Sequence, residues 1–285
     1  MRVLALDSTT RDGSVALVED DRIVDERVGD RTRTHAERLP GELTTLVDAN
    51  GFTLNDLDLV AVASGPGSFT GLRVGVATMQ ALAFVLRVPI VGVTALEAIA
   101  HLASLEVQSV TETLVGAWLD ARRRDVFSSL WRVKGDAPPF SPERLEEADG
   151  QTVAAPDLTL ERWRARLSGD SLVFAGDGTI AYREAIDRIL PDAKIVSVGP
   201  LAGAVGRIAQ ARVIGGGLEQ SGDPSTLQVV YVRRPDAEVA RERDASSTQG
   251  LDKGIRSVSD GNRGGAGAPS ARFPARWGGG GAPRE

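Results

Sequence analysis

The sequence contains no cysteine and only two histidines in 285 residues. Without cysteine it can form no disulfide framework, no thiol nucleophile and no cysteine-based metal site, which excludes redox chemistry and zinc fingers. The histidines, His35 and His101, are 66 positions apart, and neither has a second histidine four residues away on the same helix face. We therefore expect each histidine to be a surface or capping residue and not a metal ligand.

The sequence also lacks a long hydrophobic run and an excess of positive charge. No apolar run reaches the roughly 18 uncharged residues of a membrane span, because Arg87 and Pro89 interrupt the best candidate, residues 74–93. The first apolar run meets Asp7 too early for a signal peptide. A net charge of −6 argues against stand-alone binding of nucleic acid. These absences predict a soluble, cytoplasmic protein with no membrane partner.

The apolar residues that are present, 42% of the chain, can fill the cores of about two domains. Three short strands are expected at 2–6, 14–18 and 23–28, and turn residues between them indicate an antiparallel meander. A capping box of Thr34 and Glu37 opens a helix. A strand, a helix, a strand and a helix are predicted next, at 58–63, 70–87, 89–93 and 95–106.

The second half begins in the same way, with a hairpin around residues 120–125 and a strand-to-helix unit at 172–190. It therefore resembles an abbreviated copy of the first half. An α/β fold of two mixed-sheet domains is typical of the actin-like ATPases (ASKHA, RNase H-like), in which a nucleotide would lie in the cleft. The predicted domains are 1–108, 109–235 and a glycine-rich tail, 236–285, whose composition indicates disorder.

A glycine-rich loop joins the strand that ends near Ala63 to the helix that follows. Its residues are Gly65, Pro66, Gly67, Ser68, Phe69, Thr70, Gly71 and Arg73. Junctions of this kind are where α/β proteins usually bind ligands, and Ser68 is placed to cap the helix. The glycine spacing matches neither a Rossmann turn nor a Walker loop, and no lysine is near. The loop is therefore a poor candidate for a phosphate cradle.

The chain resembles the TsaB (YeaZ) family over residues 1 to about 235. The segments that carry the resemblance are 4–9, 63–75, 92–96, 120–122 with 126–127, and 231–233. Members of this family are bacterial subunits of the machinery that makes N6-threonylcarbamoyladenosine (t6A) next to the anticodon of tRNA. They share a duplicated actin-like fold with a paralogous subunit, TsaD, that performs the transfer.

The resemblance implies a non-catalytic subunit with no catalytic or metal-binding residue. Asp7, Ser8 and Thr9 stand where actin-like ATPases hold phosphate and magnesium, but the glycine of that loop is missing, so the loop is expected to be degenerate. No cofactor is expected on this chain alone, and ATP is expected to bind only at the level of the complex. The implied partners are a TsaD-like paralogue, a TsaE-like ATPase, tRNA reached indirectly through the complex, and a second copy of the chain.

The helix at 70–87 is the expected working surface, because it has two apolar faces and an interior glycine, Gly75, that suggests close approach of another helix. The predicted partner surface comprises His35, Leu39, Leu43, Leu46, Leu72, Gly75, Val76, Met79 and Ala83. Both faces could instead be internal. Two other functions stay open: an actin-like ATPase or sugar-type kinase with its own cleft, and an RNA-binding module that acts through the tail.

Overall fold

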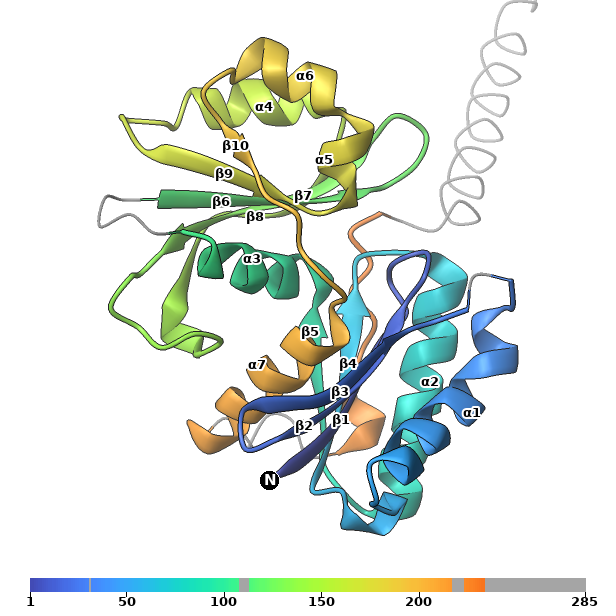
Figure 1. Ribbon diagram of the computed structural model, residues 1–285. Coiled ribbons are helices and arrows are strands. Elements are labelled where there is room, and N and C mark those ends of the chain that lie inside the picture. The colour runs from blue at the N-terminus through green and yellow to red at the C-terminus, as the bar shows by residue number, and fades with distance from the viewer. Residues whose placement is uncertain (31, 108–112, 217–222, 234–285) are drawn as a thin grey trace, which may run out of the picture. The chain divides into compact units, whose positions relative to one another are not determined.

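A computed structural model describes residues 1–30, 32–107, 113–216 and 223–233. They form two five-stranded mixed sheets with helices between and around them (Figure 1). Residues 1–233 make one compact unit. The predicted tail, 236–285, lies outside the described residues.

The first sheet has the strand order β3-β2-β1-β4-β5. Its strands are β1 (Arg2–Asp7), β2 (Ser14–Glu19), β3 (Arg22–Val28), β4 (Leu59–Gly65) and β5 (Ile90–Thr94). The central strand β1 pairs antiparallel with β2 and parallel with β4, so Val3 lies opposite both Val18 and Leu59. The predicted meander followed by parallel strands is confirmed.

The second sheet repeats this arrangement in the order β10-β9-β6-β7-β8. Its strands are β6 (Thr113–Asp120), β7 (Val126–Val133), β8 (Leu145–Ala154), β9 (Ser171–Ala175) and β10 (Lys194–Ile195). Strand β6 is the equivalent of β1, since it pairs antiparallel with β7 and parallel with β9. All five strands are present, and the abbreviation is limited to β10, which has two residues.

Two helices, α1 (His35–Ala49) and α2 (Phe69–Leu86), lie side by side on one face of the first sheet (Figure 1). The predicted capping box of Thr34 and Glu37 opens α1, after which the short η1 (Leu54–Asp56) leads to β4. Within the described residues, α2 alone is long and apolar enough to span a membrane by composition, and one side of it packs on the sheet.

Helices α3 (Ala95–Leu105) and α7 (Ala202–Ile214) cover the other face of the first sheet, and α3 also packs on the second sheet. One apolar core runs through this layer, from Val3 and Ala5 of β1 to Val115 and Ala117 of β6. The predicted domain boundary assigned α7 to the second half. The helix instead packs on β1, β2 and β4, because the apolar face of that sheet would otherwise be exposed.

The outer face of the second sheet carries α4 (Pro156–Arg164), α5 (Asp177–Ala181) and α6 (Arg183–Ile189). A cluster of Trp118, Trp163 and Phe174 fills this layer, with ring centroids 5.2 to 6.0 Å apart. The short η2 (Pro142–Arg144) lies on the other side, where it contacts α7. Strand β8 and helix α4 were not predicted. The single helix expected at 179–190 is divided at Tyr182, whose backbone is not helical.

The terminal segment, residues 223–233, begins with η4 (Pro224–Thr226) and then returns to the first sheet. The side chain of Gln80 donates hydrogen bonds to the carbonyl oxygens of Pro224 and Leu227. The amide of Val230 donates to the carbonyl of Ser64 over 2.8 Å. The segment therefore covers the end of β4, where the glycine-rich loop begins.

Candidate functional site

The glycine-rich loop is held between the terminal segment and the loop after β1. Gly65 has a φ of 125°, and a Cβ there would lie 2.5 Å from the carbonyl oxygen of Val230. Only glycine combines this backbone conformation with such a close approach. Ser68 caps α2 as predicted, because its hydroxyl accepts a hydrogen bond from the amide of Gly71 over 3.3 Å.

Three further glycines of this region pack against Ser8 and Thr9. A Cβ on Gly67 would lie 2.5 Å from the carbonyl oxygen of Thr9, and Cβ atoms on Gly71 and Gly75 would collide with the carbonyl and hydroxyl oxygens of Ser8. The interior glycine of α2 was predicted to admit a partner helix. It admits instead a loop of its own chain.

The predicted degenerate phosphate loop, Asp7, Ser8 and Thr9, begins the loop of residues 7–13, which is closed by its own side chains. One carboxylate oxygen of Asp7 accepts hydrogen bonds from the amide and hydroxyl of Thr9, at 2.8 and 2.6 Å, and the other accepts from the hydroxyl of Thr10 at 2.7 Å. Asp7 is 1% exposed. A carboxylate and an amide that bind each other are not free to hold magnesium and phosphate.

Arg38 of α1 also holds this loop in place. Its side chain is 2% exposed, and its guanidinium donates to the carbonyl of Asp12 and to the carboxylate of Glu42, both over 2.5 Å. His35 lies beside it, half-buried, with Nδ1 3.4 Å from Arg38. Burial, followed by the positive charge of Arg38, lowers the pKa of His35, so the imidazole is neutral near pH 7.

His101 is not the surface or capping residue that was predicted. Its side chain is 1% exposed and stacks on Phe140 with ring centroids 5.7 Å apart. Burial lowers its pKa to about 3, and the charges of Arg212 and Arg144 add to the shift. Within the described residues, no group of three histidine, aspartate or glutamate side chains could hold a metal ion.

The predicted partner surface is wrong about which side of α1 and α2 faces outward. All of its members except His35 are buried. Leu39, Leu43, Leu46, Val76, Met79 and Ala83 share a core with the first sheet, and Leu72 and Gly75 are buried beside them. Both faces of α2 are apolar, so periodicity did not distinguish the face that the sheet covers.

The exposed face of α2 is apolar too. Phe84 and Val85 are 76% and 74% exposed, and the smaller Ala77 and Ala81 continue this face toward the start of the helix. The neighbouring face of α1 offers small residues, including Gly41, next to which the structure leaves open space. Phe84 and Val85 were missed as site residues, although two large apolar side chains in succession near a helix end are a usable signal.

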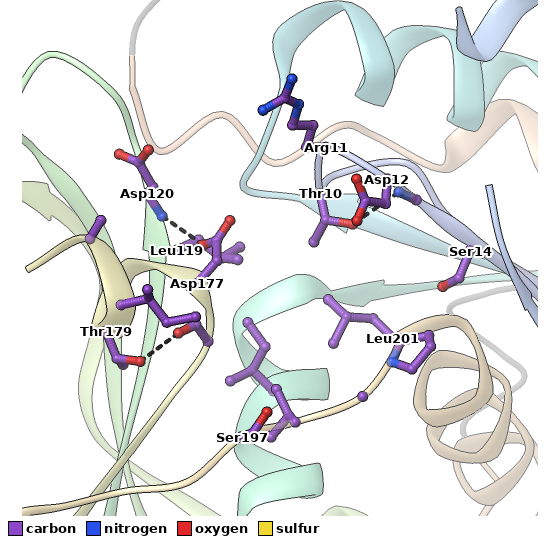
Figure 2. Close-up of a pocket in the computed structure, with 18 of the residues that line it drawn as sticks. Thr10, Arg11, Asp12, Ser14, Leu119, Asp120, Asp177, Thr179, Ser197 and Leu201 are labelled. Carbon is purple, nitrogen blue, oxygen red and sulfur yellow. Dashed lines mark hydrogen bonds between the residues drawn. The ribbon is translucent and has the colours of Figure 1, made fainter. Parts of the chain in front are cut away.

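A pocket of about 760 Å³ lies between the two halves of the unit (Figure 2). Thr10, Arg11 and Asp12 line one side, Asp120 and Asp177 line the other, and the connection at residues 195–201 forms its floor. None of the described residues that line it is a histidine, cysteine or lysine.

The carboxylates on the second side of the pocket are partly engaged. The amide of Asp120 donates to Asp177 over 2.9 Å, and the guanidinium of Arg122 lies 3.1 Å from the carboxylate of Asp120. Asp177 is accessible from the pocket but enclosed by its walls, and this enclosure, with the nearby charge of Asp120, raises its pKa. The pocket has the volume for a small ligand, while the loop that would hold phosphates is closed.

The comparisons with known proteins agree on one family. The model of the family described as "TsaD: tRNA N6-adenosine threonylcarbamoyltransferase" matches residues 29–195. A TsaB protein of Haemophilus influenzae is 32% identical over 205 residues, which cover 68% of this chain and 80% of that protein. An uncharacterized protein of Mycobacterium tuberculosis is 43% identical over 128 residues, 44% of this chain and 56% of its own length. The chain thus spans little more than half of that relative.

Solved structures give the same result. YeaZ from Pseudomonas aeruginosa superposes with a TM-score of 0.63 at 26% identity, covering 81% of this chain and 99% of that one. A second structure, described as an uncharacterized protein with similarity to peptidase YeaZ from the same species, has a TM-score of 0.60 at 25% identity. The predicted fold, an α/β duplication of actin-like domains, is confirmed. Family model, sequence relatives and structures together show that the chain belongs to the TsaB (YeaZ) family.

Proposed function

We propose that this protein is a non-catalytic subunit of the machinery for t6A biosynthesis, and that it binds a TsaD-like catalytic paralogue through the exposed face of α1 and α2. The observation that carries the proposal is the apolar end of α2, where Phe84 and Val85 point away from the core of a TsaB-family chain. Large exposed apolar side chains on a rigid helix are typical of protein interfaces.

The closed loop at residues 7–13 supports a non-catalytic role. Asp7 binds the hydroxyls and amide that a nucleotide-binding loop would offer to phosphate. In our proposal the paralogue supplies the transfer chemistry, ATP binds only at the level of the complex, and a TsaE-like ATPase joins it. The assembly acts on tRNA in the cytoplasm. A second copy of this chain competes with the paralogue for the same helix face.

Co-expression with the TsaD-like paralogue tests the interface. The wild-type chain should form a 1:1 complex, and Phe84→Asp should weaken it by about 100-fold or more, because it places a charge in the apolar centre of the contact. The matched control is Leu158→Asp on α4, an equally drastic change at a side chain that is 69% exposed. Equal affinities for both variants would contradict the proposed surface.

The biological role needs a separate measurement. Depletion of the protein in cells, followed by mass spectrometry of digested tRNA, should show loss of threonylcarbamoyladenosine. An unchanged amount of threonylcarbamoyladenosine in tRNA would contradict the proposal.

The pocket between the halves favours a second candidate, an actin-like ATPase or kinase with its own cleft. Titration calorimetry with ATP and magnesium separates the two, since tight binding and turnover by the isolated chain would support the enzyme.

A further inference from the structure

The turn between β6 and β7 carries three consecutive arginines in the left-handed backbone conformation. Arg122, Arg123 and Arg124 have φ values of 59°, 54° and 66°, and all three side chains are exposed. Left-handed backbone is costly for a residue with a Cβ, and glycine or asparagine would adopt it more easily. We call these three residues the arginine turn. Strained backbone of this kind clusters at functional sites, which makes the turn a candidate for a function of its side chains.

The terminal segment pairs with one acidic residue beside the arginine turn. Arg233 donates to the carbonyl of Ala121 over 2.7 Å and to the carboxylate of Asp125. Arg122 is ion-paired with Asp120 and still 72% exposed. Arg124 makes no hydrogen bond or ion pair with any other described residue, so its guanidinium is available to a ligand.

Two residues before Arg233, the same segment meets the start of α2. Tyr231 accepts a hydrogen bond from Nε of Arg73 over 2.8 Å, and the guanidinium of Arg73 lies 4.0 Å from the centroid of the Phe69 ring. Phe69 and Tyr231 are 43% and 41% exposed, and their ring centroids are 5.5 Å apart. We call Phe69, Arg73 and Tyr231 the aromatic stack. It holds an arginine fork in a fixed orientation against two partly exposed rings.

The arginine turn and the aromatic stack are joined through the terminal segment, and together they carry more basic than acidic groups. The arginines at 73, 122, 123, 124 and 233 outnumber the neighbouring aspartates at 120, 125 and 177, in a chain whose net charge is −6. Arginine forks beside exposed aromatic rings suit RNA, which offers phosphates to the first and bases to the second. An acidic protein partner could pair its carboxylates with the arginines, but it would give the exposed aromatic rings no role.

We propose that the arginine turn and the aromatic stack form a surface of this chain that contacts RNA directly, with arginines on phosphates and a base from an unpaired loop on the exposed rings. The proposal rests on the function proposed above and deepens it, since it gives this subunit its own contact with the RNA that the assembly modifies.

The test is a fluorescence anisotropy titration of a labelled transcript of a tRNA anticodon stem-loop, at several salt concentrations. The full-length chain is used alone and in complex with the TsaD-like paralogue. Arg124→Glu should weaken binding by about 5-fold or more and reduce the slope of log affinity against log salt by about one. The matched control, Arg183→Glu on α6, removes an arginine that is 61% exposed and should change affinity less than about 2-fold.

Tyr231→Leu tests the ring face independently. It should weaken RNA binding by about 5-fold while the salt slope stays unchanged, because a stacking contact and not a phosphate contact is lost. Tyr231→Phe keeps the ring and should bind nearly as well as the wild type, which separates stacking from loosening of the terminal segment. Thermal melts of both variants report on folding.

Two results would overturn the proposal. One is equal RNA affinity and equal salt slope for Arg124→Glu and Arg183→Glu. The other is an Arg124→Glu variant that binds the paralogue more weakly but, when tested alone, binds RNA as well as the wild type. The surface would then be a contact with the paralogue and not with RNA. If the wild-type chain fails to bind the paralogue, the proposed function fails, and titration of the chain alone still decides whether this surface binds RNA.

Discussion

The loops that follow β1 and β6 occupy equivalent places in the two halves and are built in opposite ways. Both begin with an aspartate, Asp7 and Asp120, whose carboxylate binds residues of its own loop. The first loop is buried at its start, from Asp7 to Thr9, and is closed by Arg38. The second points outward and exposes three arginines. The same strand connection therefore supports the fold in one half and offers side chains to solvent in the other.

The helices differ in the same sense. In the first half, α2 is 18 residues long with an apolar outer end, whereas the corresponding region of the second half is divided into α5 and α6, of 5 and 7 residues. A duplicated fold thus does not imply duplicated use. In our proposals, one half provides a long helix for a partner, and the other provides a basic turn.

The largest effect should come from the arginine that closes the first loop. Arg38→Met should lower the free energy of unfolding by about 3 kcal/mol, because Glu42 and the carbonyl of Asp12 lose a buried charged donor. The equivalent change in the second loop, Arg122→Met, should cost less than about 0.5 kcal/mol, since the side chain is 72% exposed. Urea denaturation of both variants measures the difference. Similar decreases in the free energy of unfolding would contradict the contrast between a buried first loop and an exposed second loop.

The two histidines should make the stability of the protein depend on pH. The folded chain keeps His101 neutral down to its pKa of about 3, whereas the unfolded chain takes up a proton below about 6.5. Stability should therefore fall as the pH drops from 6.5 toward 3, by up to about 1.4 kcal/mol per pH unit from this residue, or about 2 kcal/mol at pH 5. His101→Gln should remove that part of the slope in urea denaturation at pH 7 and pH 5. His35, beside the first loop, has a shift of the same sign. An unchanged slope in His101→Gln would show that the imidazole is hydrated in the folded state.

The smallest effects should come from one substitution made at two glycines. Gly75→Ala should destabilise the protein by about 1 to 2 kcal/mol, because the new Cβ meets the hydroxyl of Ser8 and forces the first loop to shift. Gly41→Ala on the exposed face of α1 should stabilise it by about 0.5 to 1 kcal/mol, since nothing lies within 4 Å of that Cβ. Thermal melting of the two variants would contradict the inward packing of the first loop if both changed stability in the same direction.

The sequence predicted the strands of the first half well, because they are apolar and the breaks between them carry strong turn residues. Strand β8 and helix α4 escaped prediction for a local reason. Residues 145–154 contain glutamates, an aspartate and a glycine and form an edge strand with little burial, and α4 is a short helix with charged side chains between its few apolar ones. Neither segment carries the apolar periodicity on which prediction depends.

The candidate site was only partly predictable. The glycine-rich loop and the Ser68 cap follow from residue types and spacing. The hydrogen bonds that close residues 7–13 were not predicted. The outward face of α2 does not, since Val76 and Val85 are equally apolar in sequence, and only the position of the sheet makes one buried and the other 74% exposed. The same holds for the partners of Arg233, which lie more than 100 residues away along the chain.

The position of α7 has a consequence for how the protein is made. This helix, residues 202–214, covers β1, β2 and β4, which leave the ribosome long before it does. The hundred or so residues between β5 and α7 take on the order of 10 s to synthesise. During that time the nascent first sheet has helices α1 and α2 on one face and no α7 on the other. The first half therefore completes this core only after α7 has been synthesised, and we expect the final packing of the first sheet to wait for residue 214.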